Sequence, residues 1–338
     1  MSAAQYAALQ AGLRAGFSLL LTLASGCDPD VLVGYAEDGG AGAEAPLPEV
    51  TWPTSMHPSN AYQGFLDHAA WRDRPLDLLH AYVDRRTFQG LVEPGWPLDE
   101  LAPFVGHVVL SEPLYPEGGL GNNADCAAGM YDAEWRKLGP FLESHGRGDA
   151  VIRLGWGFND PVKLWRSDAD PTQWIECFRH VVTAIRSAGP NVRIDWTLNA
   201  YASTVPASGD PFDAYPGDAY VDIVGTDIYD LDPPSFDEAQ WSERCEQPYG
   251  LCSTLRFARA HGKQAGVGEW GVASCGADPG GDNPFFVTQM FRTFAANDDI
   301  LAYESYFDDA GEGVCSSLTS GDLNPKAAAR YKQLYGPR

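Results

Sequence analysis

The segment Val151-Ile-Arg-Leu-Gly-Trp156 is a short apolar run that opens a repeating pattern. Asp170-Pro171, a helix-start signal, is followed by a stretch with apolar side chains every three or four residues, which ends at Gly189-Pro190. The apolar run Val192–Leu198 comes directly after it. A strand, a helix and a strand in succession predict a βαβ unit with parallel strands.

Apolar runs of strand length alternate with helix-like segments along the rest of the chain. The eight runs are Ala61–Phe65, Leu79–Val83, His107–Leu110, Val151–Trp156, Val192–Leu198, Val221–Asp227, Gln264–Glu269 and Leu301–Tyr306. Asn283-Pro284 and Asn324-Pro325 start two further helices with proline at the first position, and Gly139-Pro140 should split a helix over Asp132–Ser144. Eight strands alternating with helices over about 280 residues predict a single (β/α)8 TIM barrel, with a doubly wound sheet as the alternative α/β fold.

The N-terminal part of the chain is predicted to lie outside the barrel. Arg14 precedes an apolar run that ends at Ala24, and Ser25-Gly26-Cys27 follows, which resembles a bacterial lipoprotein signal with Cys27 as the lipidated residue. The run is too short to span a bilayer. Residues 28–58 are rich in Gly, Ala, Pro and acidic side chains, as in a flexible tether. We therefore expect a signal peptide (1–27), a linker (28–58) and the barrel (59–338) in an exported protein. It would be a cell-surface or periplasmic lipoprotein or, with an ordinary cleaved signal, a secreted protein.

The charge of the chain restricts its partners. Lys and Arg number 23 and Asp and Glu 46, so the formal net charge is −23. Nucleic acid and anionic lipid would be repelled. Membrane contact is expected through a lipid at Cys27 alone, and the protein is expected to be a monomer. With 10 Trp and 15 Tyr residues, the composition favours a neutral ligand with flat apolar faces, such as a polysaccharide or oligosaccharide.

Six cysteines remain when Cys27 is set aside, an even number in a chain that is predicted to be exported. They are Cys126, Cys177, Cys245, Cys252, Cys275 and Cys315. Disulfides are favoured, and the pairs 245–252 and 275–315 would each tie loops at one rim of the barrel. A zinc site is the alternative, although the chain has no Cys-x-x-Cys pair. We expect no cofactor and no metal.

Side chains suited to sugar binding follow the predicted strands. In a (β/α)8 barrel the active site lies at the C-terminal ends of the strands. Those ends carry Glu112, Trp156, Asn159, Trp196, Asn199, Asp227, Tyr229, Glu269, Trp270 and Tyr306. Aromatic faces pack against sugar C–H surfaces, while carboxylates and amides bond hydroxyl groups. The sequence therefore predicts a sugar-binding rim.

Four stretches at the predicted strands carry a recognisable pattern: 151–159, 222–229, 268–271 and 302–308. They resemble successive strand motifs of glycoside hydrolase family 26, the β-mannanase type of clan A hydrolase, and the resemblance covers roughly Asn60 to Tyr335. The resemblance implies a retaining hydrolase of a β-linked polysaccharide, with mannan as the best-known substrate of the family. It implies that Glu269 is the nucleophile and that Tyr229 hydrogen-bonds it. It also implies that Arg153, Trp156 and Asn159 line the subsite beside the scissile bond.

The chain departs from this family at the general acid/base. The family pattern would read Trp-Glu-Phe-Asn, whereas this chain has Trp156-Gly157-Phe158-Asn159. Retaining hydrolysis needs a second carboxyl group to protonate the leaving oxygen and later to activate water. Either another carboxyl group supplies the proton, with Asp160 nearest in sequence and Glu112 on the neighbouring strand, or the protein is a non-catalytic glycan-binding relative. An active enzyme with an altered residue or a different chemistry is the third interpretation.

Overall fold

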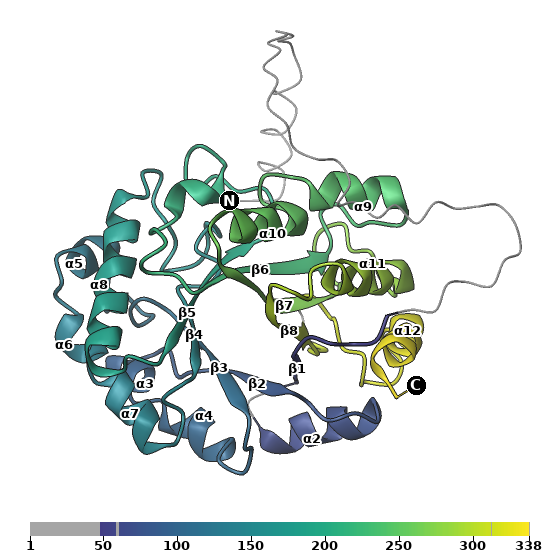
Figure 1. The fold of residues 1–338 in the computed structure, drawn as a ribbon. Helices are drawn as coiled ribbons and strands as arrows, with labels where there is room; N and C mark the ends of the chain where they lie inside the picture. The colour runs from purple at the N-terminus through teal and green to yellow at the C-terminus, as the bar shows by residue number, and fades with distance from the viewer. Residues whose placement is uncertain (1–47, 59–60, 312, 338) are drawn as a thin grey trace, which may run out of the picture. The chain divides into compact units, whose positions relative to one another are not determined.

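Eight parallel strands form one nearly closed barrel in the computed structural model, with the helices outside it (Figure 1). The structure describes residues 48–58, 61–311 and 313–337. The strand order is β1-β8-β7-β6-β5-β4-β3-β2. The strands are β1 (Thr54–His57), β2 (Leu78–Tyr82), β3 (His107–Glu112), β4 (Val151–Leu154), β5 (Arg193–Asn199), β6 (Ile223–Asp230), β7 (Gln264–Val272) and β8 (Leu301–Phe307). The predicted single (β/α)8 barrel is confirmed.

Helices follow the strands along the chain and cover the outside of the barrel (Figure 1). They are α2 (Tyr62–Trp71), α3 (Phe88–Val92), α4 (Gly95–Glu100), α5 (Asn123–Ala127), α6 (Asp132–Trp135), α7 (Leu138–Ser144), α8 (Thr172–Ala188), the 3₁₀ turn η2 (Pro211–Ala214), α9 (Glu238–Cys245), α10 (Leu251–Ala260), α11 (Pro284–Ala295) and α12 (Pro325–Tyr335). The three helices predicted after Asx-Pro signals are confirmed as α8, α11 and α12. At α11, the side chain of Asn283 caps the helix by accepting from the backbone N–H of Phe285 at 3.0 Å.

The first predicted strand is wrong, and so is the end of the predicted linker. Residues 62–65 belong to α2, directly after Ala61, and Phe65 and His68 are buried at the spacing of one helical turn. The first strand is instead β1, which pairs with β8 and lies within the predicted linker. The backbone N–H of Asp77 donates to Thr54 O at 3.0 Å and helps to bring β1 up to β2. The predicted signal peptide and Cys27 lie outside the described residues.

The predicted helix over 132–144 is divided, but not at Gly139-Pro140. It consists of α6 and α7, and the break falls at Arg136 and Lys137. Pro140 lies in the first turn of α7, where its missing N–H removes no intrahelical hydrogen bond.

The inside of the barrel is apolar at one end and polar at the other. At the N-terminal ends of the strands, five buried side chains form a separate cluster: Leu78, Val109, Val151, Ile223 and Tyr303. One step further along, inward positions carry His80, Ser111, Arg153 and Asp195, all fully buried. The apolar layer closes the bottom of the barrel, so a ligand can approach the polar layer from the C-terminal end.

All six remaining cysteines form disulfides. The pairs predicted at one rim, Cys245–Cys252 and Cys275–Cys315, are confirmed, and Cys126–Cys177 ties α5 to α8. The zinc alternative is therefore wrong. Three disulfides are compatible with a protein that folds outside the cytosol. None of the helices in the described part of the chain is long and apolar enough to cross a bilayer.

Candidate functional site

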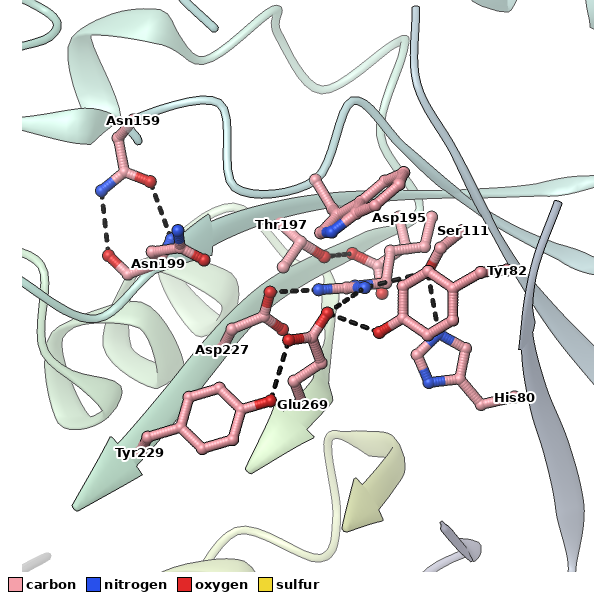
Figure 2. Close-up of polar contacts among 12 residues, drawn as sticks. His80, Tyr82, Ser111, Asn159, Asp195, Thr197, Asn199, Asp227, Tyr229 and Glu269 are labelled. Carbon is pink, nitrogen blue, oxygen red and sulfur yellow. Dashed lines mark hydrogen bonds and ion pairs between the residues drawn. The ribbon is translucent and has the colours of Figure 1, made fainter. Parts of the chain in front are cut away.

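Glu269 lies near the C-terminal end of β7, and donors from three other strands hold its carboxylate (Figure 2). Tyr82 on β2 donates to Oε1 at 2.5 Å, and Arg153 on β4 donates to the same oxygen through Nη1 at 3.1 Å. Tyr229 on β6 donates to Oε2 at 2.9 Å. We call these three donors the Glu269 clamp. The Glu269 side chain keeps 15% of its surface exposed, so it remains open to a ligand.

The backbone of β7 directs Glu269 into the barrel. Thr226 pairs with Val267, but the next residue of β6, Asp227, pairs with Glu269, so Gly268 is an extra residue in β7. Such a bulge re-aims the side chain that follows it. A Cβ atom at Gly268 would lie 2.3 Å from Arg153 Nε, so the absence of a side chain gives the guanidinium its space.

Electrostatics favour the ionised form of Glu269. Burial opposes ionisation, but the Arg153 guanidinium, the Lys163 ammonium and the two phenol donors outweigh it and hold the pKa of Glu269 below its usual value. Burial raises the pKa of Tyr82 and of Tyr229 well above the usual phenol value, so both keep their protons and donate. A carboxylate that is ionised, oriented and partly exposed can act as a nucleophile.

Asp227 lies beside Glu269 as its register partner and shares Arg153 with it (Figure 2). Its side chain is 4% exposed, and it forms an ion pair with Nη2 of Arg153. Burial raises the pKa of Asp227 well above its usual value, against the attraction of Arg153. The two neighbouring carboxyl groups therefore differ in pKa, and Glu269 is the more acidic of the two.

Arg153 supports the carboxylates rather than facing a ligand. Its side chain is 0% exposed, and Nη1 also donates to Ser111 Oγ at 2.9 Å. Ser111 Oγ in turn lies 2.8 Å from His80 Nε2. Arg153 was predicted to bind substrate, and the structure instead places it beneath Glu269 as a positioning residue.

At the β4 end, the position where the family pattern has its acid is occupied by Gly157. Gly157 adopts a φ of 63°, and a Cβ atom there would lie 3.1 Å from both Nδ2 and Oδ1 of Asn199. Asn159 is fully buried and braces the backbone of Asn199, donating to its carbonyl at 2.9 Å and accepting from its N–H at 2.7 Å (Figure 2). Asn159 therefore positions Asn199, whose side chain lies beside Gly157.

Neither suggested substitute acid is hydrogen-bonded to Glu269. Asp160 accepts from the backbone N–H of Val162 at 3.0 Å, and no hydrogen bond or ion pair among the described residues joins it to Glu269. Side chains alternate along a strand, and Ser111 points inward, so Glu112 points outward toward the helices. Glu112 is fully buried there, and neither of its carboxylate oxygens has a partner among the described residues.

Three predicted sugar-binding residues lie in the helix-facing core instead. Trp196 is fully buried against Phe158 and other rings of the helical layer. Trp270 donates through Nε1 to the buried Glu304, and Tyr306 donates to Ser316 O at 2.6 Å. All three point to the face opposite the barrel interior, because they alternate with the inward side chains of their strands.

The sequence analysis missed Tyr82 of the clamp and Lys163 beside it. Tyr82 ends β2 two residues after His80, and so shares its inward face. This strand-end position could have indicated it. Trp156, by contrast, was predicted and lies beside Tyr82, with ring centroids 5.5 Å apart.

Fold and site together define a (β/α)8 barrel with one ionised carboxylate clamped at its C-terminal end. The described residues contain no group of three or more His, Cys, Asp or Glu side chains that could hold a metal ion. The arrangement suits attack on an electrophilic carbon or the binding of hydroxyl groups.

Solved structures of similar fold are far from this chain in sequence. GH26C from Muricauda sp. MAR_2010_75 matches with a TM-score of 0.59 and 17% identity over 84% of each chain. The catalytic domain of a GH26 endo-β-1,4-mannanase from Bacillus sp. JAMB-750 has a TM-score of 0.61 and 15% identity, covering 85% of this chain and 87% of that one. A double mutant of a Cellulomonas fimi endo-β-1,4-mannanase has a TM-score of 0.56 and 15% identity, covering 79% and 65%. At these identities the likeness shows the fold. No family model and no curated protein matches the sequence.

Proposed function

We propose that this protein binds a β-linked polysaccharide at the rim of the barrel and that Glu269 is a glycosidic nucleophile of the retaining type. The observation that carries the proposal is the Glu269 clamp, which keeps one carboxylate ionised, oriented and partly exposed. Similarity of fold to GH26 mannanases supports it, as do the strand motifs that contain these residues.

The missing acid at Gly157 limits the substrates that can react. Glu269 would attack the anomeric carbon, forming a glycosyl ester as the bond to the leaving oxygen breaks. With no acid opposite, that oxygen must leave as an anion, which a dinitrophenolate can do and a sugar alkoxide cannot. With no base, water would not be activated to release the ester.

An activated substrate tests this chemistry. We expect 2,4-dinitrophenyl β-mannoside or β-glucoside to release about one equivalent of dinitrophenolate and then stall, with the glycosyl group on the protein visible by intact mass. Azide needs no deprotonation, so it should attack the anomeric carbon, free Glu269 and yield the β-glycosyl azide.

Two variants serve as the controls. Glu269→Gln should abolish the burst while leaving the melting temperature and glycan affinity nearly unchanged. Asp160→Asn should leave the burst and the stall as they are. Undiminished release by Glu269→Gln would contradict the nucleophile, and normal turnover of unactivated polysaccharide that Asp160→Asn abolishes would show that Asp160 is the acid.

Glycan binding without catalysis is the second candidate, and the vacant β4 end favours it. It predicts that the wild type and Glu269→Gln bind polysaccharide equally and that neither gives a burst. Calorimetry with both proteins, run beside the burst assay, separates the two functions.

We also propose that the protein acts outside the cytosol, anchored by a lipid at Cys27. Three disulfides and the leader-like sequence before Cys27 support the proposal. In a bacterial host, Cys27→Ala should move the protein from the membrane fraction to the soluble fraction. An unchanged membrane fraction would contradict the anchor.

A further inference from the structure

Two cations lie over a pair of tryptophan rings next to the Glu269 clamp. Lys163 Nζ is 5.4 Å from the ring centroid of Trp156 and 5.3 Å from that of Trp165. Arg85 Cζ is 5.8 Å and 6.0 Å from the same two centroids. Cations within about 6 Å of an indole face are attracted by its quadrupole, which fixes where these charges stand.

The charges of these side chains are balanced to different degrees. Arg153, 5.6 Å from the Trp156 ring, is balanced by Asp227 and Glu269. Arg85 pairs with Glu117 at 2.8 Å. Lys163 forms no ion pair with the carboxylates of the described residues. Its ammonium acts only at longer range on Glu269 and Asp227, which already share Arg153, so it has no close counter-ion among the described residues.

A short chain of contacts connects Lys163 to the nucleophile. Lys163 covers the Trp156 ring, Trp156 meets the Tyr82 ring edge to face at 5.5 Å, and Tyr82 donates to Glu269. The charge of Lys163 is also felt at Glu269, where it helps, after burial and Arg153, to set the pKa. Trp156 itself is only 2% exposed. Lys163, which covers its ring, is therefore the side chain that a sugar would meet beside the one held at Glu269.

We propose that Lys163 is a specificity-determining residue that receives an anionic group, a carboxylate or a sulfate ester, on the sugar bound beside Trp156. The polysaccharide would then be an acidic one rather than the neutral ligand that the composition favours. The net negative charge of this protein repels an anionic polysaccharide. An ammonium group without a close counter-ion would bind its anionic group at one place on the rim and so fix how the polysaccharide lies there. This inference rests on the proposed function, because it assumes that a polysaccharide occupies the rim.

Matched ligands test the inference. Hexamers of β-1,4-mannose and β-1,4-mannuronate share one backbone and differ in a hydroxymethyl or a carboxylate group on each sugar, and a sulfated mannohexaose provides the second anion. Calorimetry at low and at physiological salt would compare the wild type with Lys163→Gln. Lys137→Gln, which removes an exposed lysine paired with Glu134 at 2.6 Å, is the control for net charge.

We expect the wild type and Lys137→Gln to bind at least one anionic hexamer roughly 10-fold more tightly than the neutral one, as for a charge-assisted hydrogen bond. Lys163→Gln should abolish that preference. The anion that shows the effect identifies the substituent. If the wild type binds the neutral hexamer or gives the burst, but shows no preference for an anionic hexamer that Lys163→Gln removes, this inference alone would be wrong. A protein that binds none of the hexamers and gives no burst would overturn the proposed function with it.

Discussion

The Glu269 clamp has two opposite effects on the reactivity of the Glu269 carboxylate. Three donors keep the carboxylate ionised and fix its direction, which a nucleophile requires. The same donors withdraw electron density and reduce its basicity. A carboxylate held this way is suited to attack a carbon that already carries a good leaving group, which agrees with the activated substrates proposed above.

A second buried glutamate, Glu304, shows the opposite behaviour. It lies on the helix-facing side of β8, fully buried, and Trp270 Nε1 donates to its Oε2, while Oε1 has no partner among the described residues. Burial raises the pKa of Glu304 to about 8 from its usual 4.5. The folded protein therefore keeps a proton there that the unfolded chain has lost.

The pH dependence of stability follows from this difference. Between pH 4.5 and about 8, folding takes up a proton at Glu304, so its contribution to stability is fully present below pH 4.5 and is lost as pH rises through 8. Glu304→Gln keeps the acceptor for Trp270 but cannot ionise. The free energy of unfolding of this variant, measured relative to that of the wild type, should therefore rise by on the order of 4 kcal/mol when the pH is raised from about 5 to about 9.

Urea unfolding of the wild type and of Glu304→Gln at about pH 5 and about pH 9 measures this difference in free energy. Glu100→Gln, at an exposed position on α4, should change the free energy of unfolding equally at the two pH values. A pH dependence for Glu304→Gln that equals that of the wild type would show that Glu304 is ionised in the folded protein.

At the scale of elements, the bulge in β7 controls the site. Gly268 is the extra residue, and a Cβ atom there would collide with Arg153 Nε at 2.3 Å. Gly268→Ala should push the guanidinium away and weaken the interaction that lowers the pKa of Glu269. The acid limb of the burst rate against pH should then move to higher pH, because Glu269 must be ionised to attack.

A loop glycine provides the control for this substitution. A Cβ atom at Gly313 would have no described atom within 4 Å, so Gly313→Ala should leave both the pH profile and the melting temperature unchanged. A Gly268→Ala protein that folds and has the wild-type pH profile would show that Arg153 does not set the ionisation of Glu269.

The elements that the sequence predicted correctly are those with an apolar inner or outer face. The strands β2 to β8 each contain several aliphatic or aromatic side chains by which they can be recognised, and three helices begin at Asx-Pro signals. The run Thr54–His57 failed because its one apolar side chain is Met56, whereas β4, which also has four residues, is apolar at three of them. A single apolar residue gives no hydrophobic period to recognise.

The face on which each site residue lies was harder to predict than its strand. A strand end predicts which residues reach the rim, but a shift of one residue moves a side chain to the opposite face. Asp227, Tyr229 and Glu269 point inward, while Trp196 and Trp270 point outward into the helical layer. The bulge at Gly268 adds a shift of one residue within β7. The sequence around Gly268 contains no pattern that predicts this bulge.

At the scale of the whole molecule, catalysis by a retaining mechanism would depend on the closed barrel. β4 and β7 are separated in the sheet by β5 and β6, so an acid at position 157 and the nucleophile at 269 come from different sides of the ring. The sugar would lie between them. The polar network of Arg153, Asp227 and Ser111 fills the interior below and fixes the nucleophile side, whereas the β4 side contains Gly157 beside Asn199.

Restoring the second carboxyl group requires two substitutions. Glutamate at position 157 would adopt a left-handed φ of 63°, at a cost of about 1–2 kcal/mol. Its Cβ would also lie 3.1 Å from the amide atoms of Asn199. Asn199→Ala removes that amide and keeps the backbone bonds to Asn159. The pair Gly157→Glu with Asn199→Ala should therefore fold with a modestly lower melting temperature.

We expect this double variant to hydrolyse an unactivated β-linked polysaccharide, because the introduced carboxyl group can protonate the leaving oxygen and then deprotonate water. The matched control is Gly157→Gln with Asn199→Ala, which has the same shape and strain but no proton to transfer. Reducing-sugar release should be about 10²–10⁴-fold faster with glutamate than with glutamine, and the stalled glycosyl-enzyme should no longer accumulate. Two folded variants with equal rates would mean that the β4 end does not face Glu269 across the bound sugar, and the assignment of position 157 as the vacant acid site would be wrong.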